Sequence, residues 1–382
     1  MKGPFWAIMG DTWRQSKHQM LMLVSLMLLA MTVPLFTLTI QVQHAPDGSP
    51  FLSTRWSDEG RAQRGFDAGW DGLYADALKQ EIGLTEDIRL GRRGVEDAAA
   101  RLEEADYRLK KLTNDNAPKA VLADAANVRR DAEADLDERT AQWRALMKDE
   151  RDRVDRTLNE RTASISRLQK GTEYWLSGAV SMIYTLSMLC FIAVVAGYVP
   201  AMIEGGSIDL VLSKPIRRWQ LFYGKYVGGL LLFSAAIAVL YVLVFTGVGA
   251  VTGVWHWPFF YALPMTLFSL ALLNAIVGWV GLWTRSAAIA MVIGYIYYLV
   301  VDTAVGLLAD PAAVPYLAEL KGIKELSEFV KMTFPSFKWL RESAEASMFS
   351  IIVFPWKHIV VGLTWLVVCL GTSFNRFRIN DY

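Results

Sequence analysis

The chain has 382 residues, 53% of them hydrophobic, and a formal net charge of +1 at pH 7. Overall charge therefore gives no indication of nucleic-acid binding, and a content of only two cysteines, Cys190 and Cys369, excludes a disulfide-rich scaffold. Charged residues concentrate in residues 42–172 while the flanking stretches are nearly charge-free, which favours a multi-span membrane domain with one soluble module.

The segment before the first apolar stretch, residues 1–19, has aromatic and apolar side chains at near-helical spacing. They are Phe5, Trp6, Met9 and Trp13, and the charged residues Lys2, Asp11, Arg14 and Lys17 fall largely elsewhere. The pattern predicts a cytoplasmic amphipathic helix in the membrane interface. The alternative is an ordinary basic flank with aromatic anchors.

Six apolar stretches predict membrane-spanning helices, because lipid offers no water to unpaired backbone groups. They are residues 20–40, 174–200, 226–253, 259–283, 287–308 and 359–374, of which the last is short. The sequence thus predicts an all-α membrane protein with six transmembrane helices and, inserted after the first of them, an extracytoplasmic helical hairpin that resembles a coiled coil.

Lys and Arg in the short connections fall on one side of a six-span arrangement, which predicts that this side is cytoplasmic. These residues are Lys2, Arg14, Lys17, Lys214, Arg217, Arg218, Lys225, Arg285, Arg376 and Arg378. The opposite short loop, residues 252–258, has none. We therefore expect a multi-pass protein of the cell (inner) membrane, with residues 201–225, the tail 375–382 and both termini in the cytoplasm.

Residues 41–173 form the predicted extracytoplasmic module. Two seven-residue series, Val95, Leu102 and Leu109 with Ala98, Ala105 and Leu112, form an a/d seam that predicts a close-packed helix pair. A turn signal follows at 113–118, and the pattern resumes through Val121, Ala125, Val128 and Ala132. The many charges indicate a solvated face, with a charged ligand site as the alternative.

The second predicted extracytoplasmic segment, residues 309–358, combines an amphipathic stretch with a short apolar run. Leu317, Leu320, Ile323, Leu326 and Phe329 suggest an interfacial helix, which Pro335 interrupts. The run 348–354 is too short to span a bilayer. We expect an interfacial or re-entrant pair of helices before the last span.

The connection between the second and third spans carries a small helix pattern of its own. Gly206 is a breaker, Ser207 is an N-cap, Asp209 lies in the first turn, and Pro215 ends the helix. Between them, Ile208, Leu210, Val211 and Leu212 form an apolar knob. An exposed knob of this kind on a membrane loop indicates that a partner docks there.

This segment resembles the cytoplasmic coupling segment of ABC-2 type transporter permeases. The matching residues are Glu204, Gly206, Ser207, Ile208, Asp209, Leu212, Pro215, Ile216, Arg218, Gly224 and Lys225. The chain departs from the pattern at Val211, where Leu is usual, and at Arg217, where Ser is usual. The resemblance implies a partner ABC ATPase subunit that grips Leu210 and its neighbours, a second permease copy or related permease, and export of a substrate.

Two polar residues inside predicted spans are further candidates. A carboxylate in a membrane helix is a functional candidate by default, so Asp302 contacts substrate or a base, or is simply solvated near the interface. Asn274 is more consistent with a hydrogen bond between helices than with a ligand contact. Glu204 pairs with Arg217 or Arg218, pairs with the ATPase, or is a solvated charge.

The sequence has no motif for catalysis, nucleotides or metals. It lacks the Gly-x-x-x-x-Gly-Lys-Ser/Thr loop, the His-Glu-x-x-His pair and the Gly-x-Ser-x-Gly elbow, and its four histidines are scattered. We therefore expect no enzyme activity and no cofactor in this chain, with ATP and Mg²⁺ bound by the partner subunit.

Two functions remain open. The first is a permease subunit that couples ATP hydrolysis by a separate ATPase to substrate export or to force on the outer module. The second is a non-transporting membrane scaffold or sensor that binds an envelope partner through the outer hairpin. Membrane lipids are expected partners of either. Co-purification of an ATPase through residues 204–218 separates the two.

Overall fold

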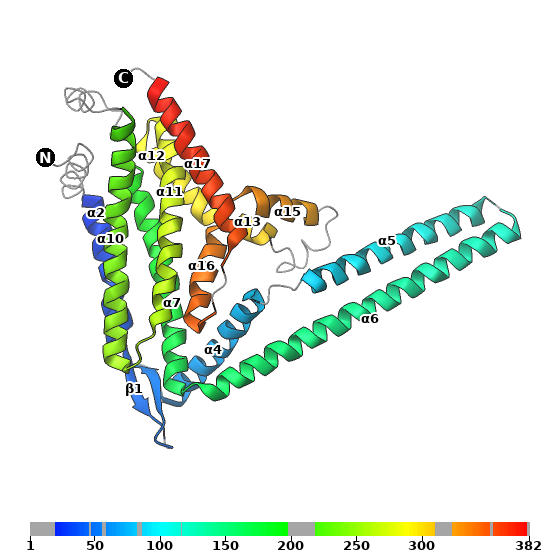
Figure 1. The fold of residues 1–382 in the computed structure, drawn as a ribbon, viewed down its shortest axis with the longest axis horizontal. Helices are drawn as coiled ribbons and strands as arrows, with labels where there is room; N and C mark the ends of the chain where they lie inside the picture. The colour runs from blue at the N-terminus through cyan, green and yellow to red at the C-terminus, as the bar shows by residue number, and fades with distance from the viewer. Residues whose placement is uncertain are drawn as a thin grey trace. The chain divides into compact units, whose positions relative to one another are not determined.

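The computed structural model describes residues 20–45, 47–55, 59–81, 86–115, 117–197, 218–309, 323–351 and 354–379, and Figure 1 shows their elements in chain order. The chain divides into two compact units. The first combines Met1–Trp70 with Arg167–Tyr382, and the second is Asp71–Ser166.

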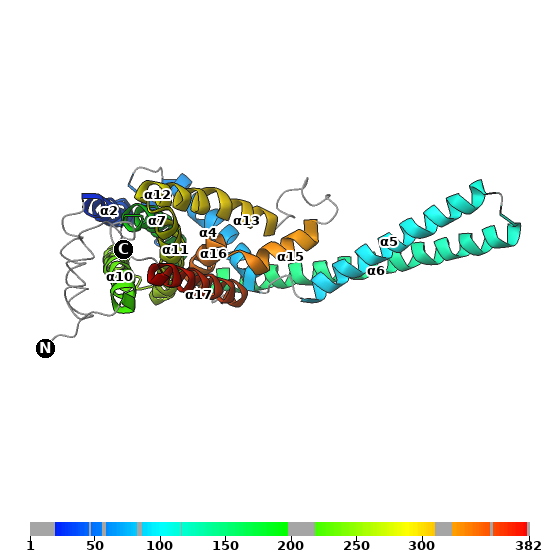
Figure 2. The same cartoon turned by 90° about the horizontal axis from the view of Figure 1, so that it is seen from above.

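Five helical stretches among the described residues are long and apolar enough to cross a membrane. They are built from α7 (Arg167–Val195), α10 (Arg218–Thr252), α11 (Ala262–Thr284, preceded by the 3₁₀ turn η1, Trp257–Tyr261), α12 (Ala287–Ile296) continued by η2 (Tyr297–Val301) and α13 (Asp302–Ala309), and α17 (Trp356–Ile379). Helix α11 lies between α7 and α17 and is the most deeply buried of the five (Figure 2).

The first predicted span is an apolar helix that is shorter than the other five. It consists of α2 (Met20–Ala30) and α3 (Thr32–Leu38), which meet at Met31, and its apolar part is Met22–Leu38. The structure therefore gives a multi-pass architecture with five span-length helices in its described residues, and the sixth span stays a prediction.

Three of the helices extend beyond the spans that the sequence predicted. Helix α7 begins at Arg167 instead of Tyr174, α10 begins at Arg218 instead of Tyr226, and α17 covers Trp356–Ile379 instead of residues 359–374. The predicted spans covered the apolar stretches alone, whereas the helices continue into flanking residues that include charged side chains.

A short two-stranded ribbon accompanies the helices among the described residues. Strands β1 (Ile40–His44) and β2 (Pro50–Thr54) pair antiparallel, with Ile40 opposite Thr54 and His44 opposite Pro50. The turn between them contains Gly48 at φ +77°, a backbone conformation that glycine adopts without strain. Strands of five residues are too short for an alternating pattern to show clearly in the sequence.

The segment before α17 contains helices α15 (Ile323–Thr333) and α16 (Phe337–Ala346) and the 3₁₀ turn η4 (Ser347–Phe349). Helix α16 is partly a core element, because Phe337, Leu340 and Ala344 are buried where α16 packs on α11 and α7. Helix α15 packs on α13 (Asp302–Ala309) and α17 instead. Between α12 and α13, residues Tyr297–Val301 form a π-helical turn, η2.

In the second unit, α5 (Glu86–Asn114) and α6 (Lys119–Ser164) pack side by side. They run antiparallel, since Arg101 pairs with Asp135 at 3.4 Å and Asp106 pairs with Arg129 at 2.5 Å. On α5 the small seam residues Ala98 and Ala105 are buried.

On α6, two of the predicted seam residues, Val121 and Val128, lie one position away from the residues that face α5. Val121 and Val128 are 44% and 47% exposed, whereas Ala125 is buried and Arg129 reaches across to Asp106 on α5. The error arose because a search for apolar residues passes over an arginine that enters the seam by pairing with a carboxylate. Helix α4 (Glu59–Glu81) contributes residues to both units.

Candidate functional site

The predicted coupling residues join α7 to α10. Glu204, Gly206, Ser207, Ile208, Asp209, Leu210, Leu212 and Pro215 lie outside the described residues, and Arg218 is the first residue of α10. The described structure resumes at Arg218. The contacts of the first turns of α10 can therefore be described residue by residue.

An aromatic cluster joins the first turns of α10 to the ends of α11 and α17. Phe222 of α10 is buried with Leu282 of α11 and Phe377 of α17. The rings of Phe222 and Phe377 are 5.7 Å apart, and Tyr223 and Phe374 pack at 5.6 Å beside them. Three helix ends thus pack against one another through these rings.

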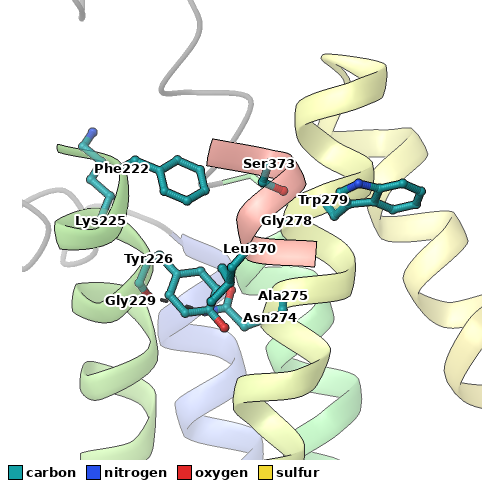
Figure 3. A pocket seen from close by; sticks show the side chains of 10 residues that line it. All are labelled: Phe222, Lys225, Tyr226, Gly229, Asn274, Ala275, Gly278, Trp279, Leu370 and Ser373. Atoms are coloured by element: carbon teal, nitrogen blue, oxygen red, sulfur yellow. Dashed lines mark hydrogen bonds between the residues drawn. The ribbon is translucent and has the colours of Figure 1, made fainter. Parts of the chain in front are cut away.

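A hydrogen-bonded contact lies one to two turns deeper between α10 and α11. The hydroxyl of Tyr226 donates to the carbonyl of Ala271 at 2.7 Å, and the side-chain amide of Asn274 donates to the carbonyl of Tyr226 at 3.4 Å (Figure 3). Both bonds use a side chain of one helix and a backbone carbonyl of the other. Asn274 therefore makes the bond between helices that one interpretation of the sequence expected.

Tyr226 and Asn274 line a small cavity between α10, α11 and α17, with Lys225 and Ser373 among its other lining residues (Figure 3). Its volume is about 20 Å³, which is room for about one water molecule. A cavity of that size does not admit an organic cargo molecule in this conformation.

Basic side chains gather at the same end. Arg376 of α17 lies with its guanidinium 4.6 Å from the centre of the Trp283 ring on α11, a cation–π geometry. Arg285 follows α11 directly and adopts a left-handed conformation with φ 53°. Lys225, Arg285 and Arg376 thus lie at the same end of the bundle.

Asp302, the carboxylate candidate inside a predicted span, contacts backbone groups of another helix. Its carboxylate accepts the N–H of Phe337 at 2.7 Å and the N–H of Lys338 at 3.1 Å, the first two residues of α16. Asp302 is 7% exposed. The structure thus places Asp302 and Asn274 at separate helix contacts and does not bring them together.

A cluster that the sequence did not single out lies at the start of α7. Glu173 is fully buried and accepts hydrogen bonds from Trp70 Nε1 at 2.8 Å and from the Gln169 amide at 3.0 Å. His256 Nδ1 is 3.9 Å from the same carboxylate, and its Nε2 is 2.6 Å from the carbonyl of Met348. The buried Lys170 ammonium lies 4.8 Å from the centre of the Trp70 ring.

This cluster ties together α4, α7, the loop before α11 and η4. The available sequence signal was a Glu and a Lys one turn apart at the edge of an apolar stretch, which also fits an ordinary helix end. Across the described residues, no group of three or more His, Cys, Asp or Glu side chains is placed to hold a metal ion. The contacts of Glu173, Trp70, His256 and Met348 make the cluster a junction of these four elements.

Comparison with known proteins identifies the family. The family model described as ABC-2 family transporter protein matches residues 13–382, nearly the whole chain. None of the curated proteins compared with the chain matches it. The family match agrees with the resemblance seen in residues 204–225 and with the five span-length helices of the bundle. The chain is therefore a multi-pass membrane protein that belongs to the ABC-2 transporter family.

Proposed function

We propose that the chain is the permease subunit of an ABC-2 type exporter and that a separate ABC ATPase docks on residues 204–218. The observation that carries the proposal is the family match over residues 13–382, because this family supplies the membrane part of ABC transporters. The sequence has no phosphate-binding loop, so ATP and Mg²⁺ bind to the partner and not to this chain.

The arrangement at the start of α10 supports a mechanical role for the preceding segment. The apolar knob at residues 208–212 ends only a few residues before Arg218, where α10 begins. From there, Phe222 packs against α11 and α17, so a push on the knob reaches three helices. Only an ATPase that contacts the knob differently in its two nucleotide states can bias these helices.

The full proposal includes an orientation and an assembly. The end that carries Lys225, Arg285 and Arg376 faces the cytoplasm, in the inner membrane, and the α5–α6 pair lies on the outer side. The chain works with a second copy or with a related permease, so that two ATPase subunits close on two knobs. The substrate class stays open.

We expect Leu210→Asp to abolish docking of the ATPase, because it buries a carboxylate in an apolar contact without a partner charge. The measurement is co-purification of an ABC ATPase from membranes in mild detergent. Recovery of the ATPase should fall by about tenfold or more, which corresponds to roughly 1.4 kcal/mol. Gly206→Pro should also weaken coupling, because it changes the start of the knob helix.

The matched control is Ser213→Ala, which changes the same segment without touching the knob. Both variant chains should insert in the membrane at wild-type levels. Wild-type recovery of the ATPase with Leu210→Asp would contradict the docking site. If an envelope protein co-purifies and no ATPase does, the permease proposal fails and the scaffold function takes its place.

A further inference from the structure

The backbone from the end of α15 to the start of α16 is hydrogen-bonded by side chains of four other elements, α17, η2, α7 and α13. Trp365 Nε1 of α17 donates to the carbonyl of Thr333 at 2.6 Å, and the Tyr297 hydroxyl of η2 donates to the carbonyl of Pro335 at 3.3 Å. The Tyr184 hydroxyl of α7 lies 3.1 Å from the carbonyl of Phe337. Asp302 of α13 accepts the N–H groups of Phe337 and Lys338.

Asp302 supplies a cap that α16 does not make for itself. The first N–H groups of any helix have no partner within the helix and need an outside acceptor. Ser336 occupies the N-cap position, but its side chain makes no capping bond to α16. A carboxylate from a helix 35 residues earlier in the chain does so instead, and its negative charge suits the positive end of α16.

The cap requires a fixed distance between α13 and α16, because both carboxylate oxygens are engaged. The π-helical turn η2 ends directly before Asp302. One extra residue in a turn rotates all later residues by about 100° relative to an uninterrupted α-helix. The rings of Tyr297 and Tyr298 in this turn lie 6.0 Å and 5.8 Å from the ring of Phe337, so η2 and the cap contact the same residue.

Phe337 is therefore held on both of its backbone groups by different membrane helices. Its N–H is bonded to Asp302 on α13, and its carbonyl is bonded to Tyr184 on α7. Tyr184 is itself bonded to Ser269 of α11 at 2.7 Å. A shift of α13 relative to α7 therefore breaks at least one of these two bonds, and α16 stays with the helix whose bond survives.

At its other end, α16 continues directly into η4, where the Met348 carbonyl contacts His256 beside Glu173. Helix α16 thus links the Asp302 cap to the junction at the start of α7. Between these two ends, Leu340 and Ala344 of α16 are buried where the helix packs on α11 and α7.

We propose that Asp302 is the positioning residue that ties α16 to the α12–α13 helix and transmits the movement of that helix to α16 during the transport cycle. The attachment of α16 by Asp302 stands independently of the transporter assignment. The transmission of movement rests on the proposed function, because it needs an ATPase to drive the helices. The experiment therefore has one arm for each part.

The first arm measures hydrogen exchange of the full-length chain in lipid nanodiscs, comparing Asp302→Ala, Asp302→Asn and the wild type. Loss of a bond to a charged acceptor should make the amides of Phe337 and Lys338 exchange about tenfold faster in Asp302→Ala. Asp302→Asn keeps one acceptor oxygen and should give a smaller increase. The control is Thr303→Ala on the adjacent exposed residue, whose hydroxyl bonds only within its own helix, to Leu299 at 2.7 Å.

Tyr184→Phe is the second variant, because it keeps the ring and removes the hydroxyl bonded to the Phe337 carbonyl. If the Asp302→Ala chain does not fold, Tyr184→Phe still tests the attachment, because it removes the bond from α7 to the Phe337 carbonyl. Faster exchange over α16 in Tyr184→Phe and Asp302→Asn supports the attachment. Exchange in Asp302→Asn and Tyr184→Phe equal to that of Thr303→Ala overturns it.

The second arm uses the chain in complex with its co-purified ATPase and adds ATP with Mg²⁺ as the probe. In the wild type, ATP should change the exchange of α16 amides by about threefold or more, and in Asp302→Asn this response should be lost. An undiminished ATP response in Asp302→Asn overturns the transmission and leaves the permease proposal standing. Absence of any ATPase from the wild-type complex overturns the transmission together with the permease proposal, whereas the first arm still decides the attachment.

Discussion

At the scale of single residues, Glu173 shows how a charged side chain becomes part of a membrane-protein core. It is fully buried at the start of α7, and its carboxylate is satisfied by donors from Trp70 and Gln169. Burial of a carboxylate is costly unless hydrogen bonds and nearby positive groups compensate for the lost water. Here His256 Nδ1 lies 3.9 Å from the carboxylate, and the Lys170 ammonium lies 4.8 Å from the centre of the Trp70 ring.

We expect Glu173→Ala to lower the free energy of unfolding by about 3 kcal/mol, because it leaves buried donors without their acceptor. Thermal unfolding of the purified chain in detergent measures the change. Trp70→Phe keeps the aromatic ring, removes one donor and should cost less, about 1 kcal/mol. Equal stability of Glu173→Ala and the wild type would show that the carboxylate is not part of the stabilising junction.

Glu345 gives a prediction about pH. Burial raises the pKa of Glu345 above its ordinary value of 4.5, and the Ser181 hydrogen bond and the Arg341 charge oppose this rise. The folded chain therefore holds this proton more tightly than the unfolded chain, so the contribution to stability is complete below pH 4.5 and is lost as pH rises through the folded-state pKa.

Glu345→Gln should consequently be more stable than the wild type at neutral pH, and the difference should shrink as the pH is lowered toward 4.5. Unfolding temperatures of both chains across this pH range test the prediction, with the low-pH values as the internal control. A difference that grows on acidification would mean that the ionised carboxylate is the stabilising form.

The sequence identified Asp302 as a residue of interest but not its role. A carboxylate in an apolar stretch is visible in any sequence, whereas its partners, the N–H groups of Phe337 and Lys338, lie 35 and 36 residues away. Glu173 escaped notice for the same reason, because its donor Trp70 is 103 residues earlier. Local pattern reveals that a polar residue is unusual, but not which distant group it meets.

At the scale of helices, close packing between α3 and α10 depends on a glycine. A β-carbon added at Gly247 would lie 2.2 Å from Thr37 Cγ2, well inside contact distance. The hydroxyl of Thr37 bonds the Val33 carbonyl at 2.7 Å, which holds this side chain in place. The two helices can therefore approach only because position 247 has no side chain.

Gly247→Ala should destabilise the chain by about 1–3 kcal/mol, since either Thr37 or α3 must shift. Gly178→Ala is the matched control, because nothing lies within 4 Å of a β-carbon at that helical glycine. Thermal unfolding in detergent compares the two. A loss of stability in Gly178→Ala as large as that in Gly247→Ala would argue against the contact between α3 and α10.

The α5–α6 pair offers a second test with neighbouring residues. Ala98 is completely buried on the seam, whereas Ala99 is exposed. Ala98→Leu should overpack the seam and speed hydrogen exchange of α5 amides by about tenfold, whereas Ala99→Leu should have almost no effect. Similar exchange in the two variants would mean that α5 and α6 do not pack through this seam in solution.

Periodicity predicted the helices well because an apolar stretch or a seven-residue repeat is a signal spread over many residues. It failed where an element was short and where a charged residue occupied a position expected to be apolar. The ribbon of β1 and β2 has only five residues in each strand. In α6, Arg129 occupies the seam through its bond to Asp106, and no single-sequence rule for apolar residues finds such a position.

At the scale of the whole molecule, the two ends of the bundle differ in chemistry. One end joins the start of α10 to the ends of α11 and α17, where Lys225, Arg285 and Arg376 lie. The other end joins the start of α7 to the loop before α11, where Glu173 and His256 meet. The Lys and Arg distribution makes the first end the cytoplasmic one in our proposal.

Labelling of intact cells with a membrane-impermeant thiol reagent tests this orientation. Ser207→Cys should stay unlabelled until the membrane is permeabilised, and Thr113→Cys, exposed near the turn between α5 and α6, should react at once. Rapid labelling of Ser207→Cys in intact cells would place the knob outside and remove the basis for an ATPase partner. Permeabilised cells give the control for reactivity of both thiols.

The burial of both native sulfur atoms has a practical consequence. Cys190 in α7 and Cys369 in α17 are 8% and 2% exposed, so neither presents its thiol to a bulky aqueous probe. A spin label or fluorophore introduced at one chosen surface position would accordingly report from that position alone. The wild-type chain is thus ready for spectroscopic distance measurements without prior removal of its own thiols.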